Sequence, residues 1–164
     1  MEDAVEGPAP AAQRLDPRYK TVLRWRAAIA GLVLTALATG AELILATAID
    51  WRPGPAMLAV ALLALAAVIV MPGRRYRRWS YAHRDEALEI AHGVLVRVET
   101  SVPFGRVQHI DIARGPIERM CGVATLALHT AGTHNSVVHL PGLAVDDAEA
   151  MRAEIREHIR REQP

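Results

Sequence analysis

The chain has 164 residues, of which 51% are hydrophobic and 23% are charged, and its formal net charge is +1. This length allows one soluble domain of ordinary size, or a smaller domain together with membrane segments. The total charge carries little information, because the arginines cluster beside two apolar runs whereas most acids lie elsewhere. The single cysteine, Cys121, excludes an intramolecular disulfide and is expected to be a small buried apolar residue.

The N-terminal residues 1–14 combine acids with proline, glycine and alanine and show no hydrophobic periodicity. Such a segment cannot bury enough apolar surface to offset the entropy that it loses on ordering. We therefore predict a disordered tail over residues 1–14, followed by a transmembrane hairpin over residues 15–78.

Two apolar stretches, residues 27–49 and 55–71, contain a single ionisable side chain between them, that of Glu42. At about 1.5 Å per residue the first stretch covers a hydrocarbon layer of about 30 Å with some tilt, whereas the second lies near the lower length limit for crossing. Residues 50–54 contain charges, an aromatic residue and two helix breakers, which leave room only for a tight turn. The second span is expected to stop at Pro72 and Gly73.

Basic residues flank the hairpin on both sides, together with interfacial aromatic residues such as Tyr19 and Trp25. Because positively charged flanks stay on the cytoplasmic side, we expect a multi-pass plasma-membrane protein with both termini in the cytoplasm and residues 50–54 outside. The arginines after the second span are also candidate contacts for anionic lipid, at about 1 kcal/mol each. The two basic groups are Arg14, Arg18, Lys20, Arg24 and Arg26 before the first span, and Arg74, Arg75, Arg77 and Arg78 after the second.

A cleavable signal peptide is an alternative interpretation of the first apolar run, because residues 46–48 resemble a cleavage site. The run is longer than the 7 to 15 residues of a usual signal core and starts well inside the chain. The arginines after Met71 also oppose a soluble part outside the cell.

Small residues recur at four-residue spacing in the first span, as Ala36 and Gly40 and as Gly31, Thr35 and Thr39. This spacing lets two helix backbones approach closely, so we expect this face to pack on the second span or on another copy. Alanine-rich spans also produce such spacing by chance.

Glu42 lies about two helical turns inside the outer boundary of the first span, where an ionised carboxylate costs several kcal/mol. Such a residue usually has a partner or lines a water-filled path, which makes Glu42 a candidate intramembrane functional residue. The alternative is a side chain that tilts outward or is protonated.

From Arg78 onward the hydrophobic pattern has a period of two, which is typical of strands. Residues 79–82 are a first candidate strand and residues 87–91 a second. His92 and Gly93 are expected to form a two-residue turn. The next strand then places the valines at 94, 96 and 98 on one face of a half-buried antiparallel hairpin.

The sheet is interrupted at residues 103–105 and resumes with Ile110 and Ile112 inward and with His109 and Asp111 outward. Residues 115–120 predict a short helical turn that Gly122 closes.

Two more strands follow, one that contains Leu126 and Leu128 and one over residues 137–140, with a polar loop over residues 133–136 between them. Residues 141–142, a proline and a glycine, are expected to end the sheet.

The closing segment predicts an amphipathic helix that begins near Asp146 or Asp147. Its apolar residues recur at three- and four-residue steps and indicate a stripe that faces a sheet, while arginines crowd the negative C-terminal end. The stripe consists of Ala148, Met151, Ile155 and Ile159, and the arginines are Arg156, Arg160 and Arg161.

An ordered series of motif residues runs through the second half of the chain: Pro103, Arg106, Val107, Gln108, Gly115, Pro116, Glu118, Arg119, Gly122, Ala124, Thr125, Leu126, Thr130, Ala131, Gly132, Pro141, Gly142 and Leu143. This series resembles the pattern of the bacterial pleckstrin-homology-like membrane proteins, the YdbS-like or DUF304 family. With the two spans, the resemblance covers about residues 15–160. Val123 replaces an expected leucine and Cys121 a larger apolar residue, and both changes keep the apolar character.

The resemblance implies a cytoplasmic pleckstrin-homology (PH)-like α+β domain over residues 79–164, which is a curled antiparallel sheet or partly open barrel with a C-terminal amphipathic helix. We expect the motif to be mainly structural, with Glu118 and Arg119 tying the helical turn to a neighbouring strand. Proteins of this family are often paired with a larger membrane protein that carries several such domains, so a hetero-complex or a homo-oligomer is expected. The candidate interaction surface lies near the interruption of the sheet and comprises Arg106, Gln108, His109, Asp111 and Arg119.

We expect no catalysis, metal binding or phosphoinositide recognition. No nucleotide-binding, hydrolase, metalloprotease or CxxC motif is present, so we predict no enzyme, cofactor, nucleic acid or small-molecule substrate. A zinc site from His129, His134 and His139 is not expected, because histidines in a polar exposed loop are rarely ligands. Phosphoinositide binding, which is associated with PH folds, is not expected either, because Arg84 stands among acids at positions 85, 86 and 89.

The main hypothesis is therefore a non-enzymatic integral membrane protein whose PH-like domain is an interaction or assembly module. The alternative is a small transport or stress-resistance component in which Glu42 lines a path between the spans. Glu42→Gln distinguishes them, because it abolishes function only in the alternative.

Overall fold

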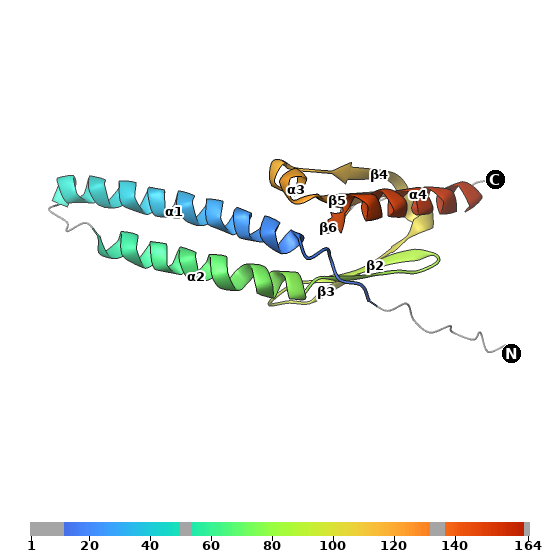
Figure 1. The fold of residues 1–164 in the computed structure, drawn as a ribbon, viewed down its shortest axis with the longest axis horizontal. Helices are drawn as coiled ribbons and strands as arrows, with labels where there is room; N and C mark the ends of the chain where they lie inside the picture. The colour runs from blue at the N-terminus through green and yellow to red at the C-terminus, as the bar shows by residue number, and fades with distance from the viewer. Residues whose placement is uncertain (1–11, 50–53, 132–136, 163–164) are drawn as a thin grey trace.

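The computed structural model describes residues 12–49, 54–131 and 137–162. Two long helices form an antiparallel hairpin at one end of an elongated molecule, and a smaller α+β domain lies at the other end (Figure 1). The predicted architecture, an apolar helical hairpin followed by a PH-like domain, is confirmed.

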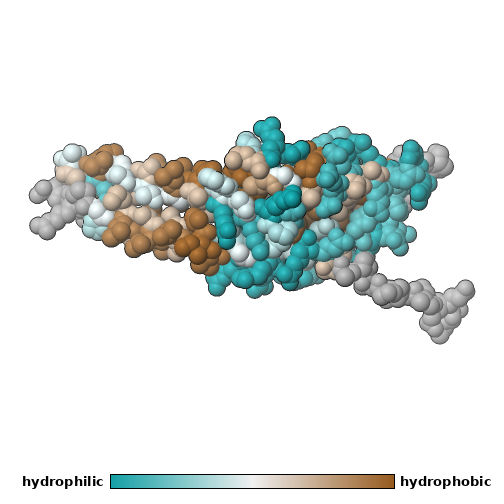
Figure 2. Space-filling model, in the orientation of Figure 1, coloured by the Kyte–Doolittle hydropathy of each residue, from teal (hydrophilic) through white to brown (hydrophobic). Residues whose placement is uncertain are grey.

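The hairpin consists of α1 (Tyr19–Ile49) and α2 (Pro55–Arg77), which are both long and apolar enough to cross a membrane. Only 6% of the most apolar window of each helix is buried, and Leu32 and Leu63 are 72% and 71% exposed. The hairpin surface in Figure 2 carries large apolar patches whereas the domain is mostly hydrophilic. An apolar surface of this extent is compatible with lipid rather than with water.

The second helix is longer than expected, because it continues through Pro72 and Gly73 to Arg77. A proline removes one helical hydrogen bond, but membrane helices tolerate this loss because neighbouring groups compensate for it. The final turn is held from outside the helix, since the buried Tyr76 hydroxyl donates a hydrogen bond of 2.7 Å to the carbonyl oxygen of Leu15.

The two helices approach closely at Gly31, where an added Cβ would lie 3.0 Å from the Cβ of Ala64. This part of the small-residue face packs on the second span, as predicted. A Cβ at Gly40 would meet no atom of the described residues within 4 Å. The hydroxyls of Thr35 and Thr39 each donate a hydrogen bond of 2.9 Å to the carbonyl one turn earlier, so they are satisfied within the helix.

The domain contains two three-stranded antiparallel sheets, which are not joined into a closed barrel within the described residues. The order of strands is β1-β2-β3 in the first sheet and β4-β5-β6 in the second. The elements are β1 (Ser80–His83), β2 (Ala87–His92), β3 (Val98–Pro103), a 3-10 turn η1 (Phe104–Arg106), β4 (Val107–Ala113), α3 (Pro116–Cys121), β5 (Val123–Thr130), β6 (Val137–Ala144) and α4 (Val145–Glu162).

The connection between β2 and β3 differs from the predicted two-residue turn. His92 pairs with Val98, so residues 93–97 lie outside the ladder and no strand begins at residue 94. Gly93 has the expected positive φ, of 117°. The alternation of valines here does not indicate a buried face, because Val96 is 72% exposed and Val98 is 43% exposed, while Leu95, between Val94 and Val96, is 99% exposed.

The last strand also differs from the prediction, because β6 continues through Pro141 and Gly142 instead of ending there. The pairing register shifts by one residue between Ala124 and Leu126 of β5, which makes a bulge in the opposite strand. β6 lies at the edge of its sheet, where proline is tolerated, and Gly142 adopts the φ of 71° at the bulge.

Three local predictions are confirmed. His109 and Asp111 are exposed on β4 whereas Ile110 between them is buried. The short helix α3 ends at Gly122, whose φ of 69° is left-handed. The apolar stripe of α4 faces the core through Ala148, Met151 and Ile155. The polar loop at residues 133–136 and the tight turn at residues 50–53 lie outside the described residues.

The hydrophobic core of the domain includes the domain ends of both membrane helices. The side chains of the segment before α1, of its first turns and of the end of α2 are at most 6% exposed and form one cluster with the strands and α4. The contributing residues are Leu15, Tyr19, Val22, Leu23 and Tyr76. The hairpin is therefore built into the domain rather than joined to it by a free linker.

The segment before α1 is also paired with the sheet. The amide of Gln13 donates a hydrogen bond of 2.7 Å to the carbonyl of Tyr81, and the Tyr81 amide donates one of 3.0 Å in return. Ordered structure thus begins before residue 15. Residues 1–11 of the predicted tail lie outside the described residues.

Candidate functional site

Three of the five residues predicted for the interaction surface lie on β4. Gln108, His109 and Asp111 are exposed, and β4 pairs with β5 on one side only within the described part of the chain. An edge strand presents backbone donors and acceptors that a further strand can use.

A carboxylate between two imidazoles marks the outer face of this edge. One oxygen of Asp111 lies 2.7 Å from the Nε2 of His109, and the other lies 3.1 Å from the Nε2 of His129. The pairing register explains this cluster, because His129 on β5 lies directly opposite His109. All three side chains are more than a third exposed, so the cluster is a polar surface patch rather than a buried catalytic group.

The histidines do not provide a metal centre among the described residues, where no group of three or more metal-ligating side chains is suitably placed. His129 and His139 lie on β5 and β6, and His134 falls outside the described residues.

The other two predicted surface residues lie apart from this edge. Arg106, in η1, lines a cleft of about 520 Å³ between the two sheets, together with residues of β3 and β6. Arg119 is exposed on α3, which follows the opposite end of β4. The predicted surface is therefore three separate features and not one continuous patch.

The predicted lipid-contact arginines lie at the domain end of α2. Arg74, Arg75 and Arg77 occupy its last turns and Arg78 is its C-cap, and all four are exposed. The ammonium of Lys20 on α1 lies 4.5 Å from the centre of the Tyr76 ring. Positive charge therefore surrounds the point where the hairpin enters the domain.

Glu42 lies at the far end of the hairpin and is 4% exposed. Its carboxylate accepts hydrogen bonds of 2.7 Å from the backbone amides of Gly54 and Ala56, at the start of α2. A negative charge at a helix N-terminus is stabilised by the unpaired amides and by the helix dipole. This geometry gives Glu42 a structural role in joining the two helices.

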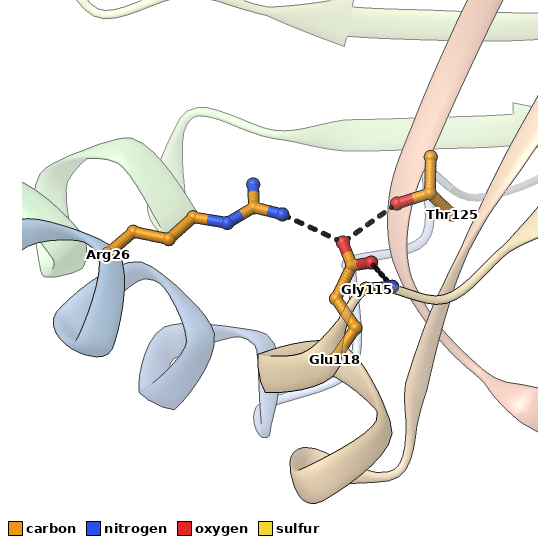
Figure 3. Close-up of polar contacts among 4 residues, drawn as sticks. All are labelled: Arg26, Gly115, Glu118 and Thr125. Atoms are coloured by element: carbon orange, nitrogen blue, oxygen red, sulfur yellow. Dashed lines mark hydrogen bonds and ion pairs between the residues drawn. The ribbon is translucent and has the colours of Figure 1, made fainter.

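Glu118 connects the membrane helices to the domain (Figure 3). Its Oε1 accepts hydrogen bonds of 3.1 Å from Arg26 of α1 and from the hydroxyl of Thr125 on β5, while its Oε2 accepts one of 2.7 Å from the amide of Gly115. The Glu118 side chain is 6% exposed and that of Arg26 is 52% exposed. One carboxylate thus ties α1, α3 and β5 together.

The contact of Glu118 with β5 agrees with the predicted tie between the helical turn and a strand, but the Arg119 side chain is exposed and makes no such contact in the described structure. The role of Arg26 was not predicted. It is one of several arginines in a basic group, and its partner lies 92 residues away, so no local pattern distinguishes it. Cys121, predicted to be buried, is half-buried.

Comparisons with known proteins agree with this arrangement. A family model described as "Bacterial PH domain" matches residues 27–161, which include most of α1, all of α2 and almost the whole domain. The UPF0699 transmembrane protein YdbS of Bacillus subtilis (strain 168) is 31% identical over 91 residues, which are 56% of this chain and 55% of that protein. The match thus spans about half the length of this relative. No solved structure matches the chain.

Proposed function

Since the chain belongs to the bacterial PH domain family, we propose that it is a non-enzymatic integral membrane protein whose PH-like domain is an interaction or assembly module. The observation that supports this most directly is the β4 edge, where one backbone side pairs with no strand of the described residues and the side chains of Gln108, His109 and Asp111 are exposed. The partner is a membrane protein with related domains or a second copy of this chain.

In the proposed orientation the domain and both termini face the cytoplasm. The arginines at the end of α2 and the basic residues of the first turns of α1 gather at the domain end of the hairpin, and positively charged flanks favour the cytoplasmic side. The four arginines after Gly73 then face the anionic inner leaflet of the plasma membrane.

In assembly through β4, the backbone contributes to the affinity for the partner and the side chains contribute to the specificity. Hydrogen bonds along a strand edge provide affinity with little sequence preference, whereas alternate side chains set the partner. The exposed carboxylate of Asp111, held between His109 and His129, suits a partner strand with a lysine or arginine at the facing position.

The test is photocrosslinking in cells from an unnatural residue at Gln108, with the same residue at the exposed Glu149 of α4 as the control. We expect a membrane-protein adduct from position 108 that Asp111→Ala weakens and that position 149 does not give. Equal adducts from both positions, or none from either, would contradict assembly through β4.

The transport alternative is less favoured by the geometry of Glu42, because both of its carboxylate oxygens bind the backbone at the start of α2. In our proposal, Glu42→Gln weakens the hairpin but leaves the crosslink from position 108 in place. A lost phenotype in a Glu42→Gln protein that keeps its stability and its crosslink would instead support the transport alternative.

A further inference from the structure

The described part of the domain exposes four large apolar side chains, and these lie in only two places. Leu95 is 99% exposed, Val96 is 72% exposed and Val98 is 43% exposed at the β2–β3 turn, and Met120 on α3 is 77% exposed. A domain with a well-filled core gains nothing from leaving these residues in water. Their grouping indicates a contact surface.

Both places lie at the end of the domain that meets the hairpin. The first residue of β1, Ser80, closely follows α2 and pairs with Ala91, and the ring of Trp79 stacks on that of His92 at 4.6 Å. The β2–β3 turn therefore leaves the sheet beside the last residues of α2. α3 lies beside the domain end of α1 (Figure 1), to which Glu118 ties it.

From these observations we propose that residues 93–97 and Met120 enter the headgroup region of the same leaflet that the hairpin enters, as two contacts between the domain and the bilayer in addition to the spans. This contact goes beyond the proposed assembly through β4 and does not depend on it.

The distances fit a lipid contact. The apolar part of α2 ends at Met71, and six further residues of helix place Arg77 about 9 Å beyond it. The headgroup region of one leaflet is about 5–8 Å thick. A five-residue turn that points back along α2 adds about 7 Å of reach, so Leu95 arrives near the edge of the hydrocarbon layer.

The charges around the two apolar tips fit an anionic lipid surface. Arg119 precedes Met120, and the exposed arginines of α2 are followed by Trp79, which stacks on His92 at the start of the β2–β3 turn. Arg97 is paired with Glu99 at 2.7 Å and contributes less net charge. Apolar tips with a basic rim are typical of segments that bind at the membrane interface. A soluble protein partner would require no such continuity with the spans.

The experiment uses the full chain in vesicles of phosphatidylcholine and phosphatidylglycerol. In a Cys121→Ser background, an environment-sensitive fluorophore is attached to Leu95→Cys. The matched exposed control carries it on Asp85→Cys, in the β1–β2 turn at the other end of β2. We expect a blue-shifted emission at position 95 that lipids with a shallow nitroxide group quench and aqueous iodide does not. At position 85 the emission should lie at longer wavelength, and iodide should quench it whereas the nitroxide lipid should not.

Each other outcome overturns the proposal. Equal quenching by iodide at positions 95 and 85 would mean that the turn lies in water. Protection from iodide without quenching by the nitroxide lipid would mean that protein, such as a second copy of the chain, covers the turn. The variant Met120→Ser with Leu95→Ser, both at exposed sites, should keep the melting temperature in detergent, which separates loss of membrane contact from loss of folding.

Discussion

Replacing Glu118 by glutamine should destabilise the domain through a single lost hydrogen bond. The carboxylate accepts hydrogen bonds on both oxygens, from the Gly115 amide on one and from Arg26 and Thr125 on the other. An amide has only one acceptor oxygen, so in either orientation its NH2 group faces a donor. A buried donor left without a partner costs about 1–3 kcal/mol. The ion pair adds little beyond this, because Arg26 is 52% exposed and a pair of this kind contributes at most about 1 kcal/mol.

The assay is thermal unfolding of the purified protein in detergent, followed by circular dichroism. For a domain of this size a loss of about 2 kcal/mol lowers the melting temperature by roughly 8–16 °C. The matched control is Arg119→Gln, at the next position along α3, which is exposed and should change stability by less than about 0.5 kcal/mol. If Glu118→Gln and Arg119→Gln melt together, the carboxylate does not hold the junction and our explanation is wrong.

Three further predictions concern the other joints of the molecule. Tyr76→Phe leaves the buried carbonyl of Leu15 without its donor and should cost about 1–3 kcal/mol in the same melt, whereas an unchanged melting temperature would mean that water replaces the hydroxyl. Gly142→Ala puts a Cβ 2.4 Å from the Tyr19 ring at a φ of 71°, so it should lower the free energy of unfolding by at least about 2 kcal/mol. The control Gly73→Ala, which has no atom of the described residues within 4 Å of the added Cβ, should be neutral or stabilising, and equal melting temperatures of the two variants would contradict the close packing. Glu42→Gln loses one of two amide partners at the start of α2 and should lower the melting temperature of the protein in vesicles by an amount equivalent to about 1–2 kcal/mol; no shift there would exclude the capping role.

Much of the fold could be predicted from the sequence because each element has its own local signal. The two apolar runs are long and apolar enough to cross a membrane, and the alternation around Ile110 places His109 and Asp111 outside. Where local signals compete, the prediction is wrong. Pro72 ends a helix in water but not in a hairpin whose last turn is held by Tyr76, and the bulge allows β6 to pass through Gly142.

The candidate site was less predictable than the fold, because it depends on contacts between distant parts of the chain. The side chains on β4 follow from strand alternation, and the place of His129 beside them needs the pairing register. Arg119 is adjacent to Glu118 in the sequence, yet one is exposed and the other is buried, because α3 turns only one of them towards α1. No pattern within a short window carries this information.

The core that both membrane helices share with the domain has a consequence for how the protein is made. Leu15, Tyr19, Val22 and Leu23 are all at most 5% exposed, and their burial contributes about 6–12 kcal/mol in total, at about 1.5–3 kcal/mol each. This is comparable to the whole folding free energy of a typical domain, about 5–15 kcal/mol. The C-terminal half released from the ribosome would be unstable without the earlier segment. A shortened chain that starts after α2 lacks these core side chains, so we expect it to be unstable.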